Sequence, residues 1–419
     1  MTEATPFSFL HCADLHLDSP FRGLGETAPT IAKALERASF SALERITALA
    51  LEHEVDFVVF AGDVYDGTDR SLTAQLRFRD ALARLSAAGI ESFIAHGNHD
   101  PLPSWHRDLE LPVGAHRFAG APLERFVVQR RGRTVAQLHG YSYPQREVRE
   151  SVVPHFPKRP GPPFAIGVLH ANVGGQSGHG GYAPCSVDDL VATGFDYWAL
   201  GHVHRRQLLY EGGPWVVYPG FTQGRSVREL GAGGCYVVEV DEAGRARPVF
   251  APTDAVRWHR AKITLEPGEP LETLLDRALA EREATRGDER PTILRLEVTG
   301  RTDLDGRLRR PEPRRELLEA LRDGEEERPD FVWIEGLEVA TAPALDLEAR
   351  RRQEDFAGEV LRRVDELRRH PEAAAELRRR LEARPEARLI RDHLDSLPDD
   401  DLVSLLDEVE AATADRLEL

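Results

Sequence analysis

Five short stretches of this sequence place side chains that can hold metal ions directly after apolar runs of strand length. They are Asp14 with His16 after 7–12, Asp63 after 57–61, Asn98 with His99 after 93–95, His170 after 165–169, and His202 with His204 after 197–200. In open α/β sheets, ligands bind in the crevice beyond the carboxyl ends of the strands. We therefore expect the five stretches to meet at one site.

The side chains of these stretches form a mixed nitrogen and oxygen set, which suits Mn²⁺, Fe²⁺ or Zn²⁺ better than Ca²⁺. No cysteine belongs to the set, which argues against a structural zinc site. Side chains two residues apart on an extended segment share one side, so the pairs at 14–16 and 202–204 can each converge. Two metals about 3.5–4 Å apart stabilise both the attacking and the leaving oxygen of a phosphoester displacement. The set therefore predicts a two-metal centre that hydrolyses phosphoesters.

The five stretches resemble, in order, the motifs of the calcineurin-like metallophosphoesterase superfamily. These motifs are DxH, GDxxD, GNHD, a lone histidine and GHxH. Five segments resemble the bacterial DNA-repair exonuclease branch called YhaO, which is similar to the SbcD nuclease. These are FLHCADLHLDSPFRGL at 9–24, HGNHD at 96–100, and YAPCSVDDL, FDYWALGHVHRRQLL and VVYPGFTQGR between 182 and 225. The resemblance covers residues 1–240.

The resemblance implies a role for each residue of the motifs. One metal would be held by Asp14, His16, Asp63 and His204, and the other by Asp63, Asn98, His170 and His202. Asp63 would then bridge the metals, and a hydroxide between them would be the nucleophile. The implied cofactors are two divalent metal ions, Mn²⁺ foremost, with Fe²⁺ or Zn²⁺ as alternatives.

The same resemblance implies roles beside the metals. His99 would lie beside the scissile phosphate and stabilise or protonate the leaving oxygen. Asp100 would orient a ligand or His99. Asp66 follows the bacterial pattern, whereas eukaryotic and archaeal relatives tend to carry histidine there, so the role of that histidine does not transfer.

The elements that position these side chains alternate between strands and helices through residue 255. Short apolar runs predict strands at 7–12, 56–61, 91–95, 134–139, 164–169, 197–200, 215–218 and 235–240, and apolar spacing predicts helices at 30–53 and 71–88. The alternation predicts a layered α/β domain, and close spacing of the later strands predicts an antiparallel or mixed sheet. The resemblance implies the four-layer α/β/β/α metallophosphoesterase sandwich for residues 1–255.

The rest of the chain divides into two parts. Residues 256–342 are expected to form a small α/β accessory domain, with strands at 261–265, 292–298 and 331–339, helices at 271–286 and 314–322, and a basic turn at 307–315. Residues 343–419 carry apolar residues at helical spacing and predict a helical C-terminal region. A packed cap is the simplest interpretation of that region, and docking of a partner protein is the alternative.

Charge does not exclude a nucleic-acid partner. The 419 residues include 71 acidic and 54 basic ones, which gives a net charge of -17. Residues 1–250 carry 28 acids and 24 bases, so the acidity lies mainly in the C-terminal part. All but three of the basic residues are arginine, whose planar guanidinium binds phosphate well. The base composition of the genome explains this preference for arginine over lysine equally well.

The remaining composition predicts a cytoplasmic protein without a membrane partner. Three cysteines without a CxxC pair form neither a disulfide framework nor a zinc site. No apolar run approaches the roughly 20 residues of a membrane span, and the first residues lack the features of a signal peptide.

Three residues outside the metal motifs are candidates for substrate binding. Arg205 and Arg225 follow the GHxH motif and a glycine-rich turn, where they can meet substrate phosphates. Solvated surface arginines are the alternative. Tyr182 can stack on a base or simply anchor its loop.

With the resemblance, the sequence predicts a metal-dependent DNA exonuclease of double-strand-break repair, with 3′-to-5′ polarity and some endonuclease activity. The implied partners are DNA, an SMC-like coiled-coil ATPase and a second copy of the chain. A phosphatase or cyclic-nucleotide phosphodiesterase is one alternative, although DLHLD lacks the glycine that follows DxH in protein phosphatases. A DNA-end-binding scaffold with a vestigial nuclease is the other, and the intact ligand set argues against it.

Overall fold

The computed structural model describes residues 5–19, 29–67, 71–104, 110–176, 181–286, 290–344, 351–369, 372–384 and 406. The chain divides into two compact units. The first comprises Met1–Ala261, Ala280–Arg295 and Arg322–Gly336, and the second comprises Lys262–Leu279, Leu296–Leu321 and Leu337–Leu419. The three domains bounded at residues 255 and 342 stay a prediction.

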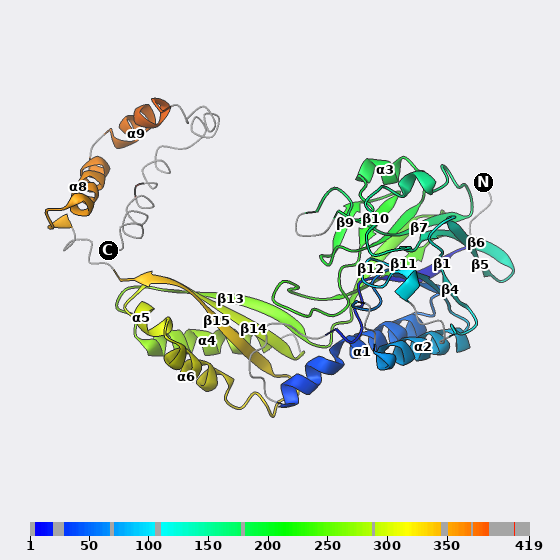
Figure 1. Ribbon diagram of the computed structural model, residues 1–419, viewed down its shortest axis with the longest axis horizontal. Helices are drawn as coiled ribbons and strands as arrows, with labels where there is room; N and C mark the ends of the chain where they lie inside the picture. The colour runs from blue at the N-terminus through cyan, green and yellow to red at the C-terminus, as the bar shows by residue number, and fades with distance from the viewer. Residues whose placement is uncertain are drawn as a thin grey trace. The chain divides into compact units, whose positions relative to one another are not determined.

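Two six-stranded mixed sheets form the centre of the first unit (Figure 1). In strand order, the first sheet consists of β12 (Ala246–Pro252), β11 (Gly234–Val240), β1 (Phe7–Cys12), β2 (Phe57–Ala61), β3 (Glu91–Ala95) and β4 (Ala115–Arg117). The second sheet consists of β5 (Glu124–Arg130), β6 (Arg133–Tyr141), β7 (Phe164–His170), β8 (Tyr197–Gly201), β10 (Trp215–Tyr218) and β9 (Gln207–Tyr210).

The two sheets pack face to face through aromatic and branched side chains. Phe9 stacks on Phe57 with ring centroids 5.1 Å apart, and the edge of Tyr197 from the other sheet meets Phe9 at 5.2 Å. Both faces of β2 are buried, as expected for a central strand that reads as a continuous apolar run. This shared core fixes the two sheets as one sandwich.

Helices cover the two outer faces of the sandwich. α1 (Pro29–Glu52) and α2 (Leu72–Ala87) pack on the first sheet through apolar residues at helical spacing. Three shorter helical segments of the sandwich are α3 (Val187–Val191) and two 3₁₀ turns, η1 (Leu102–Ser104) and η2 (Val153–His155). Figure 1 shows α1 and α2 on one side of the sandwich and α3 on the opposite side. The predicted four-layer α/β/β/α fold is confirmed.

Parallel pairing brings the carboxyl ends of the central strands to the same edges. β1, β2 and β3 run parallel in the first sheet, and β6, β7, β8 and β10 run parallel in the second. The last residues are in register, because Ala61 pairs with Ala95 and His170 with Gly201. The segments that follow β1, β2, β3, β7 and β8 therefore start close together.

The strands missing from the prediction are β4, β5, β9 and β12, which are the four edge strands of the two sheets. Each is short or alternates between exposed and half-buried residues. An edge strand lies half in water and needs no apolar run, so its sequence lacks the pattern on which the other strands were predicted.

A third sheet follows the sandwich in sequence. It consists of β13 (Arg257–Leu265), β14 (Thr292–Thr302) and β15 (Val332–Pro343), with α4 (Leu271–Thr285) between the first two strands. α5 (Asp305–Leu308) and α6 (Pro311–Arg322) connect β14 to β15. The basic turn predicted at 307–315 is too long. Only Arg309 and Arg310 lie in a turn, between α5 and α6, whereas Arg307, Arg314 and Arg315 lie on the two helices.

The described C-terminal segments are helical. α8 (Phe356–Arg369) buries Leu361 and Val364, and α9 (Ala373–Glu382) follows it. The rest of the predicted helical region, from 385 onward apart from residue 406, lies outside the described residues. Among the residues that the structure describes, no helix combines the length and apolar character needed to cross a membrane.

A buried histidine between the sheets makes stability depend on pH. His11 on β1 is fully buried, with Nδ1 3.1 Å from the Tyr197 hydroxyl and Nε2 3.2 Å from the Leu200 carbonyl oxygen. Burial, opposed by the Leu200 hydrogen bond, lowers the pKa of His11 from 6.5 to about 3. As the pH falls, the unfolded chain takes up this proton first. The stability that the neutral ring contributes is therefore complete above pH 6.5 and declines as the pH falls toward 3.

We expect this single group to remove about 2 kcal/mol of unfolding free energy between pH 7.5 and pH 5. Urea unfolding of the wild type and of His11→Gln at both pH values measures the effect. The glutamine variant should lose less stability on acidification than the wild type, whereas His53→Gln, at an exposed position, should match the wild type. Equal losses in all three proteins would contradict the assignment.

Candidate active site

The segments that follow β1 and β2 carry three candidate metal ligands at backbone positions with unfavourable φ angles. Asp14, His16 and Asp63 have positive φ angles of 51°, 42° and 50°, which cost free energy for residues other than glycine. Backbone hydrogen bonds hold the segments together, because Asp14 N donates to Gly62 O at 3.1 Å and His16 N donates to Asp63 O at 3.0 Å. The strain is thus maintained by pairing of the two segments that follow β1 and β2.

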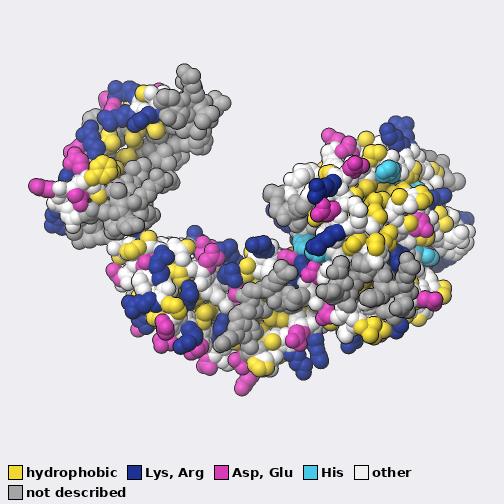
Figure 2. Space-filling model, viewed as in Figure 1, with side chains coloured by type: hydrophobic (Ala, Val, Ile, Leu, Met, Phe, Trp, Pro, Cys, Tyr) yellow, Lys and Arg dark blue, Asp and Glu magenta, His cyan; other side chains and the backbone are white. Residues whose placement is uncertain are grey.

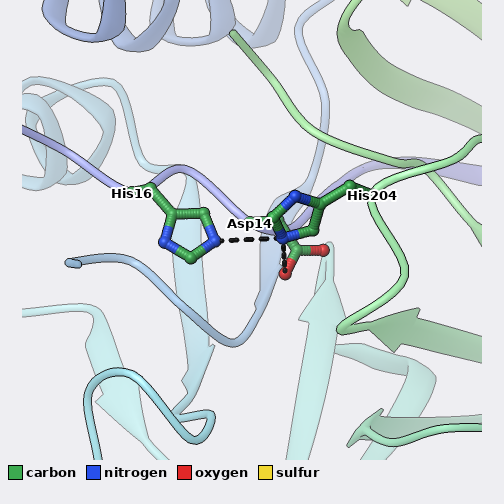
Figure 3. Close-up of side chains that lie close together, drawn as sticks. All are labelled: Asp14, His16 and His204. Atoms are coloured by element: carbon green, nitrogen blue, oxygen red, sulfur yellow. Dashed lines mark hydrogen bonds and ion pairs between the residues drawn. The ribbon is translucent and has the colours of Figure 1, made fainter. Parts of the chain in front are cut away.

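One group of candidate ligands consists of Asp14, His16 and His204 (Figure 3). The Nε2 atoms of His16 and His204 lie 3.2 Å apart, and His204 Nε2 lies 3.8 Å from Asp14 Oδ1. The Asp14 carboxylate also accepts a hydrogen bond from His202 N at 3.1 Å. Two imidazole nitrogens and a buried carboxylate therefore face one point, a geometry that favours a cation.

A second group consists of Asp14, Asp63 and His170. His170 Nδ1 lies 3.0 Å from Ala61 O, and since a carbonyl only accepts, Nδ1 carries the proton. His170 Nε2 is thereby directed at Asp63 Oδ2 and Asn98 Oδ1, each at 3.2 Å. Burial lowers the pKa of His170, but the Asp63 carboxylate raises it more, to about 9. The electrostatic field at this point thus favours positive charge.

Asp63 lies between the two groups. Its Oδ2 is 3.2 Å from His170 Nε2 and 3.8 Å from His16 Nε2, while its Oδ1 accepts a hydrogen bond from His99 N at 2.9 Å. The His202 ring lies 5.2 Å from the His170 ring. The clusters of histidine and aspartate are consistent with a two-metal site, and their mixed nitrogen and oxygen donors fit Mn²⁺, Fe²⁺ or Zn²⁺.

Gly97 permits this close approach. A Cβ atom at position 97 would lie 2.2 Å from Asp63 Oδ1 and 2.7 Å from His170 Nε2. Any larger residue would displace two candidate ligands, which gives a physical reason for the glycine of the GNHD motif.

His99 is held by Asp66. His99 Nδ1 and Asp66 Oδ1 are 2.7 Å apart, and the histidine side chain is one-third exposed. Burial lowers the pKa of His99, but the hydrogen bond to Asp66 and the nearby carboxylates raise it more, so the pKa lies above its ordinary value. His99 is thus arranged to hold a proton at Nε2, as a general acid requires.

Asp100 supports the backbone rather than His99. Its carboxylate is fully buried, accepts hydrogen bonds from Gly97 N at 2.8 Å and Val64 N at 3.0 Å, and lies 3.2 Å from His96 Nδ1. These contacts join the segments after β2 and β3, which carry Asp63, Asn98 and His99.

A cavity of about 810 Å³ opens onto the candidate ligands. Asp63, Asn98, His99, His202 and His204 form part of its wall, together with Tyr182, whose ring meets the His202 ring edge-on at 5.5 Å. Four arginines also line the cavity, namely Arg146, Arg205, Arg206 and Arg228. Figure 2 shows histidine side chains at the surface with basic side chains beside them.

Arg225 does not line this cavity among the described residues. Its guanidinium instead lies 3.3 Å from Asp66 and 3.1 Å from Glu229. The candidate substrate-binding residues predicted from the sequence are therefore separated: Arg205 and Tyr182 line the cavity, and Arg225 does not.

Glu229 and Arg146 are site residues that sequence reasoning missed. Glu229 Oε1 lies 2.6 Å from His204 Nδ1, which places the His204 proton on Nδ1 and leaves Nε2 as the candidate metal-binding atom. Burial raises the pKa of Glu229, but the bonds from His204 and Arg225 lower it more. Neither residue belongs to a spaced motif, so the sequence offered no signal for either.

We expect Glu229→Gln to weaken Mn²⁺ binding by about 10–100-fold, because the carboxylate orients His204 and increases its basicity. Calorimetric titration of metal-stripped protein with Mn²⁺ measures the change. Glu239→Gln, at an exposed position on the neighbouring β11, is the matched control and should bind Mn²⁺ like the wild type. Unchanged affinity in Glu229→Gln would rule out this role.

Comparison with known proteins agrees with this fold and identifies the family of the chain. Residues 7–206 match the sequence model of the calcineurin-like phosphoesterases, and residues 258–342 match that of the middle domain of the metallophosphoesterase YhaO. The chain is 36% identical over 330 residues to the metallophosphoesterase YhaO of Bacillus subtilis (strain 168), covering 78% of this chain and 80% of that protein. The chain therefore belongs to the calcineurin-like metallophosphoesterases and, among them, to the YhaO family.

More distant similarities extend to other proteins. The DNA double-strand break repair protein Mre11 of Aeropyrum pernix is 28% identical over 272 residues, covering 62% of this chain and 64% of that protein. A crystal structure of a dimetal phosphatase from Danio rerio aligns with 59% of this chain and 99% of its own, at 13% identity and a TM-score of 0.34.

Proposed function

We propose that this protein is a metal-dependent phosphodiesterase that shortens DNA from its ends with 3′-to-5′ polarity and has some endonuclease activity. The observation that carries the proposal is the cavity in which candidate metal ligands and His99 meet four arginines. Similarity to the DNA double-strand break repair protein Mre11 supports DNA as the substrate and double-strand-break repair as the setting.

The charge of the cavity wall favours a phosphate chain. Arg146, Arg205 and Arg228 are exposed, whereas the two acidic residues of the wall, Asp63 and Glu229, are buried against histidines. A polyanion that enters therefore meets arginine guanidinium groups, which bind phosphate oxygens in pairs. A small phosphomonoester would use few of them.

The residues divide the chemistry among themselves. Asp14, His16, Asp63 and His204 would hold one divalent cation, and Asp63, Asn98, His170 and His202 the other. When bound, the two cations supply Lewis acidity to the phosphoryl oxygens and activate water for attack. His99 holds a proton for the leaving oxygen, and Asp66 keeps its ring in place. The arginines of the wall align the strand, and Tyr182 offers a ring on which a base can stack.

We expect Arg205→Ala with Arg228→Ala to weaken DNA binding and to lower the slope of log affinity against log salt by about 1 for each arginine that contacts a phosphate. Titration of labelled duplex at several salt concentrations, with Ca²⁺ in place of Mn²⁺, gives the slope. Turnover of bis(p-nitrophenyl) phosphate should change little, because its single phosphate can bind at the metals alone. A slope equal to that of the wild type would contradict the arginine assignment.

Duplexes labelled at the 3′ or the 5′ end test the proposal. With Mn²⁺, the 3′ label should appear at once as a mononucleotide, whereas the 5′ label should pass through a ladder of shortening strands. Efficient cleavage of a phosphomonoester or a cyclic nucleotide with intact duplex would favour the phosphatase or cyclic-nucleotide alternative. Metal-independent binding of DNA without turnover would favour the scaffold.

The proposed partners rest on family similarity alone. An SMC-like coiled-coil ATPase and a second copy of this chain would act with the nuclease in the cytoplasm. Co-purification of the full-length chain with such an ATPase, and its mass in solution, test these two proposals.

A further inference from the structure

Arg225 lies between two carboxylates that come from distant parts of the chain. Its Nη1 is 3.3 Å from Asp66 Oδ2, and its Nη2 is 3.1 Å from Glu229 Oε1. Arg225 Nη1 also donates to Ser19 Oγ at 3.0 Å, and that hydroxyl donates to Asp66 Oδ2 at 2.6 Å. The backbone N–H of Arg225 donates to Glu229 Oε2 at 2.7 Å. The guanidinium is thus committed to protein partners and has little freedom to meet substrate.

The two carboxylates hold different histidines of the site at hydrogen-bond distance, and Asp66 Oδ1 also lies 3.7 Å from His16 Nδ1. Asp66 presents Oδ1 to His99 Nδ1 at 2.7 Å, and Glu229 presents Oε1 to His204 Nδ1 at 2.6 Å. In both cases the histidine is held through Nδ1, which leaves Nε2 for the site. One of these imidazoles is the candidate proton donor, and the other is a candidate metal ligand.

Charge and burial explain why a cation is needed between the carboxylates. The side chains of Asp66 and Arg225 are each 17% exposed, and that of Glu229 is 10% exposed. Two partly buried carboxylates that share one region repel each other, and the guanidinium fork offers an N–H group to each of them. Without that fork, each carboxylate can rotate toward water and release its histidine.

We propose that Arg225 is a positioning residue that holds Asp66 on His99 and Glu229 on His204, and so sets both imidazoles with one side chain. The proposal deepens the proposed function, on which its proton-transfer part rests. It replaces the expectation that Arg225 binds substrate phosphate.

The test compares Arg225→Met with Arg247→Met, which removes an exposed arginine on β12. Arg225→Met should weaken Mn²⁺ binding, measured by calorimetry, by about tenfold or more. At saturating Mn²⁺ its kcat should fall about tenfold more on DNA than on bis(p-nitrophenyl) phosphate, because only the DNA alkoxide needs a proton. Arg247→Met should match the wild type in both measurements.

Double variants separate positioning from general structural damage. Adding Arg225→Met to Asp66→Asn should change the ratio of DNA to bis(p-nitrophenyl) phosphate turnover little beyond Asp66→Asn alone, since both changes disable the same contact. Arg225→Lys keeps the charge, but its single ammonium cannot serve both carboxylates as a fork does. It should show smaller losses in both measurements, and it remains informative if the methionine variant does not fold.

Several results would overturn the proposal. The first is an Arg225→Met variant with the Mn²⁺ affinity of the wild type and the wild-type ratio of DNA to bis(p-nitrophenyl) phosphate turnover. If the methionine variant does not fold, wild-type values of both quantities in Arg225→Lys have the same meaning. The last is a rise in KM for DNA without any other change, which would assign Arg225 to phosphate binding. If the wild type cleaves bis(p-nitrophenyl) phosphate but not DNA, the proposed function fails. The Mn²⁺ affinity of the Arg225 variants then still supports or overturns the positioning of His204.

Discussion

Asp63→Asn should lower phosphodiester turnover by about 10³-fold or more, which corresponds to about 4 kcal/mol of transition-state stabilisation. Asp63 Oδ2 is within 4 Å of ring nitrogens from both candidate ligand groups, at 3.2 Å from His170 and 3.8 Å from His16. An asparagine at this position removes a charge that the two cations would share, and its amide nitrogen is no metal ligand. Steady-state hydrolysis of bis(p-nitrophenyl) phosphate at saturating Mn²⁺ measures the loss.

The matched control is Asp80→Asn, which removes an exposed aspartate on α2. This variant should keep wild-type turnover and Mn²⁺ stoichiometry. Asp63→Asn should bind fewer Mn²⁺ ions per chain than the wild type in calorimetric titration. Turnover within tenfold of the wild type in Asp63→Asn would show that Asp63 does not connect two metals.

His99→Ala should reduce kcat on DNA by about 10²–10⁴-fold, the range typical of a lost general acid. The reduction on bis(p-nitrophenyl) phosphate should be much smaller, because p-nitrophenolate leaves as a stable anion without a proton. Mn²⁺ binding should remain close to that of the wild type, since His99 belongs to neither of the groups that contain Asp14, although it forms a third candidate group with His16 and Asp66. Parallel turnover of the two substrates, together with Mn²⁺ titration, measures all three expectations.

His155→Ala, at an exposed position in η2, is the control for loss of a histidine. An equal fall on both substrates in His99→Ala would assign His99 to binding of the phosphate rather than to protonation of the leaving oxygen. A loss of Mn²⁺ from His99→Ala would instead make it a ligand.

The central strands were predictable because burial on both faces requires continuous apolar runs, as in β2. The edge strands were not, because water on one side relaxes that requirement. The same reasoning applies to the site. Candidate ligands were visible because each follows directly after a buried strand, where the sheet topology brings them together.

The contacts behind the ligands could not be predicted from the sequence. Arg225 and Asp66 are 159 positions apart, and Arg225 and Ser19 are 206 positions apart. No local pattern shows such pairing. The sequence of this chain therefore suggested phosphate binding for Arg225 and no role for Glu229. In the folded chain, Glu229 contacts His204 Nδ1, and Arg225 contacts Glu229 and Asp66.

The measurement that tests the central claim most directly is digestion of end-labelled linear duplex by metal-stripped protein as Mn²⁺ is added. We expect no shortening without metal and shortening that saturates as the two-ion site fills. With Asp63→Asn, shortening should be slower by about 10³-fold or more at every Mn²⁺ concentration. Shortening by metal-stripped protein in the presence of a chelator, or undiminished shortening by Asp63→Asn, would contradict the central claim.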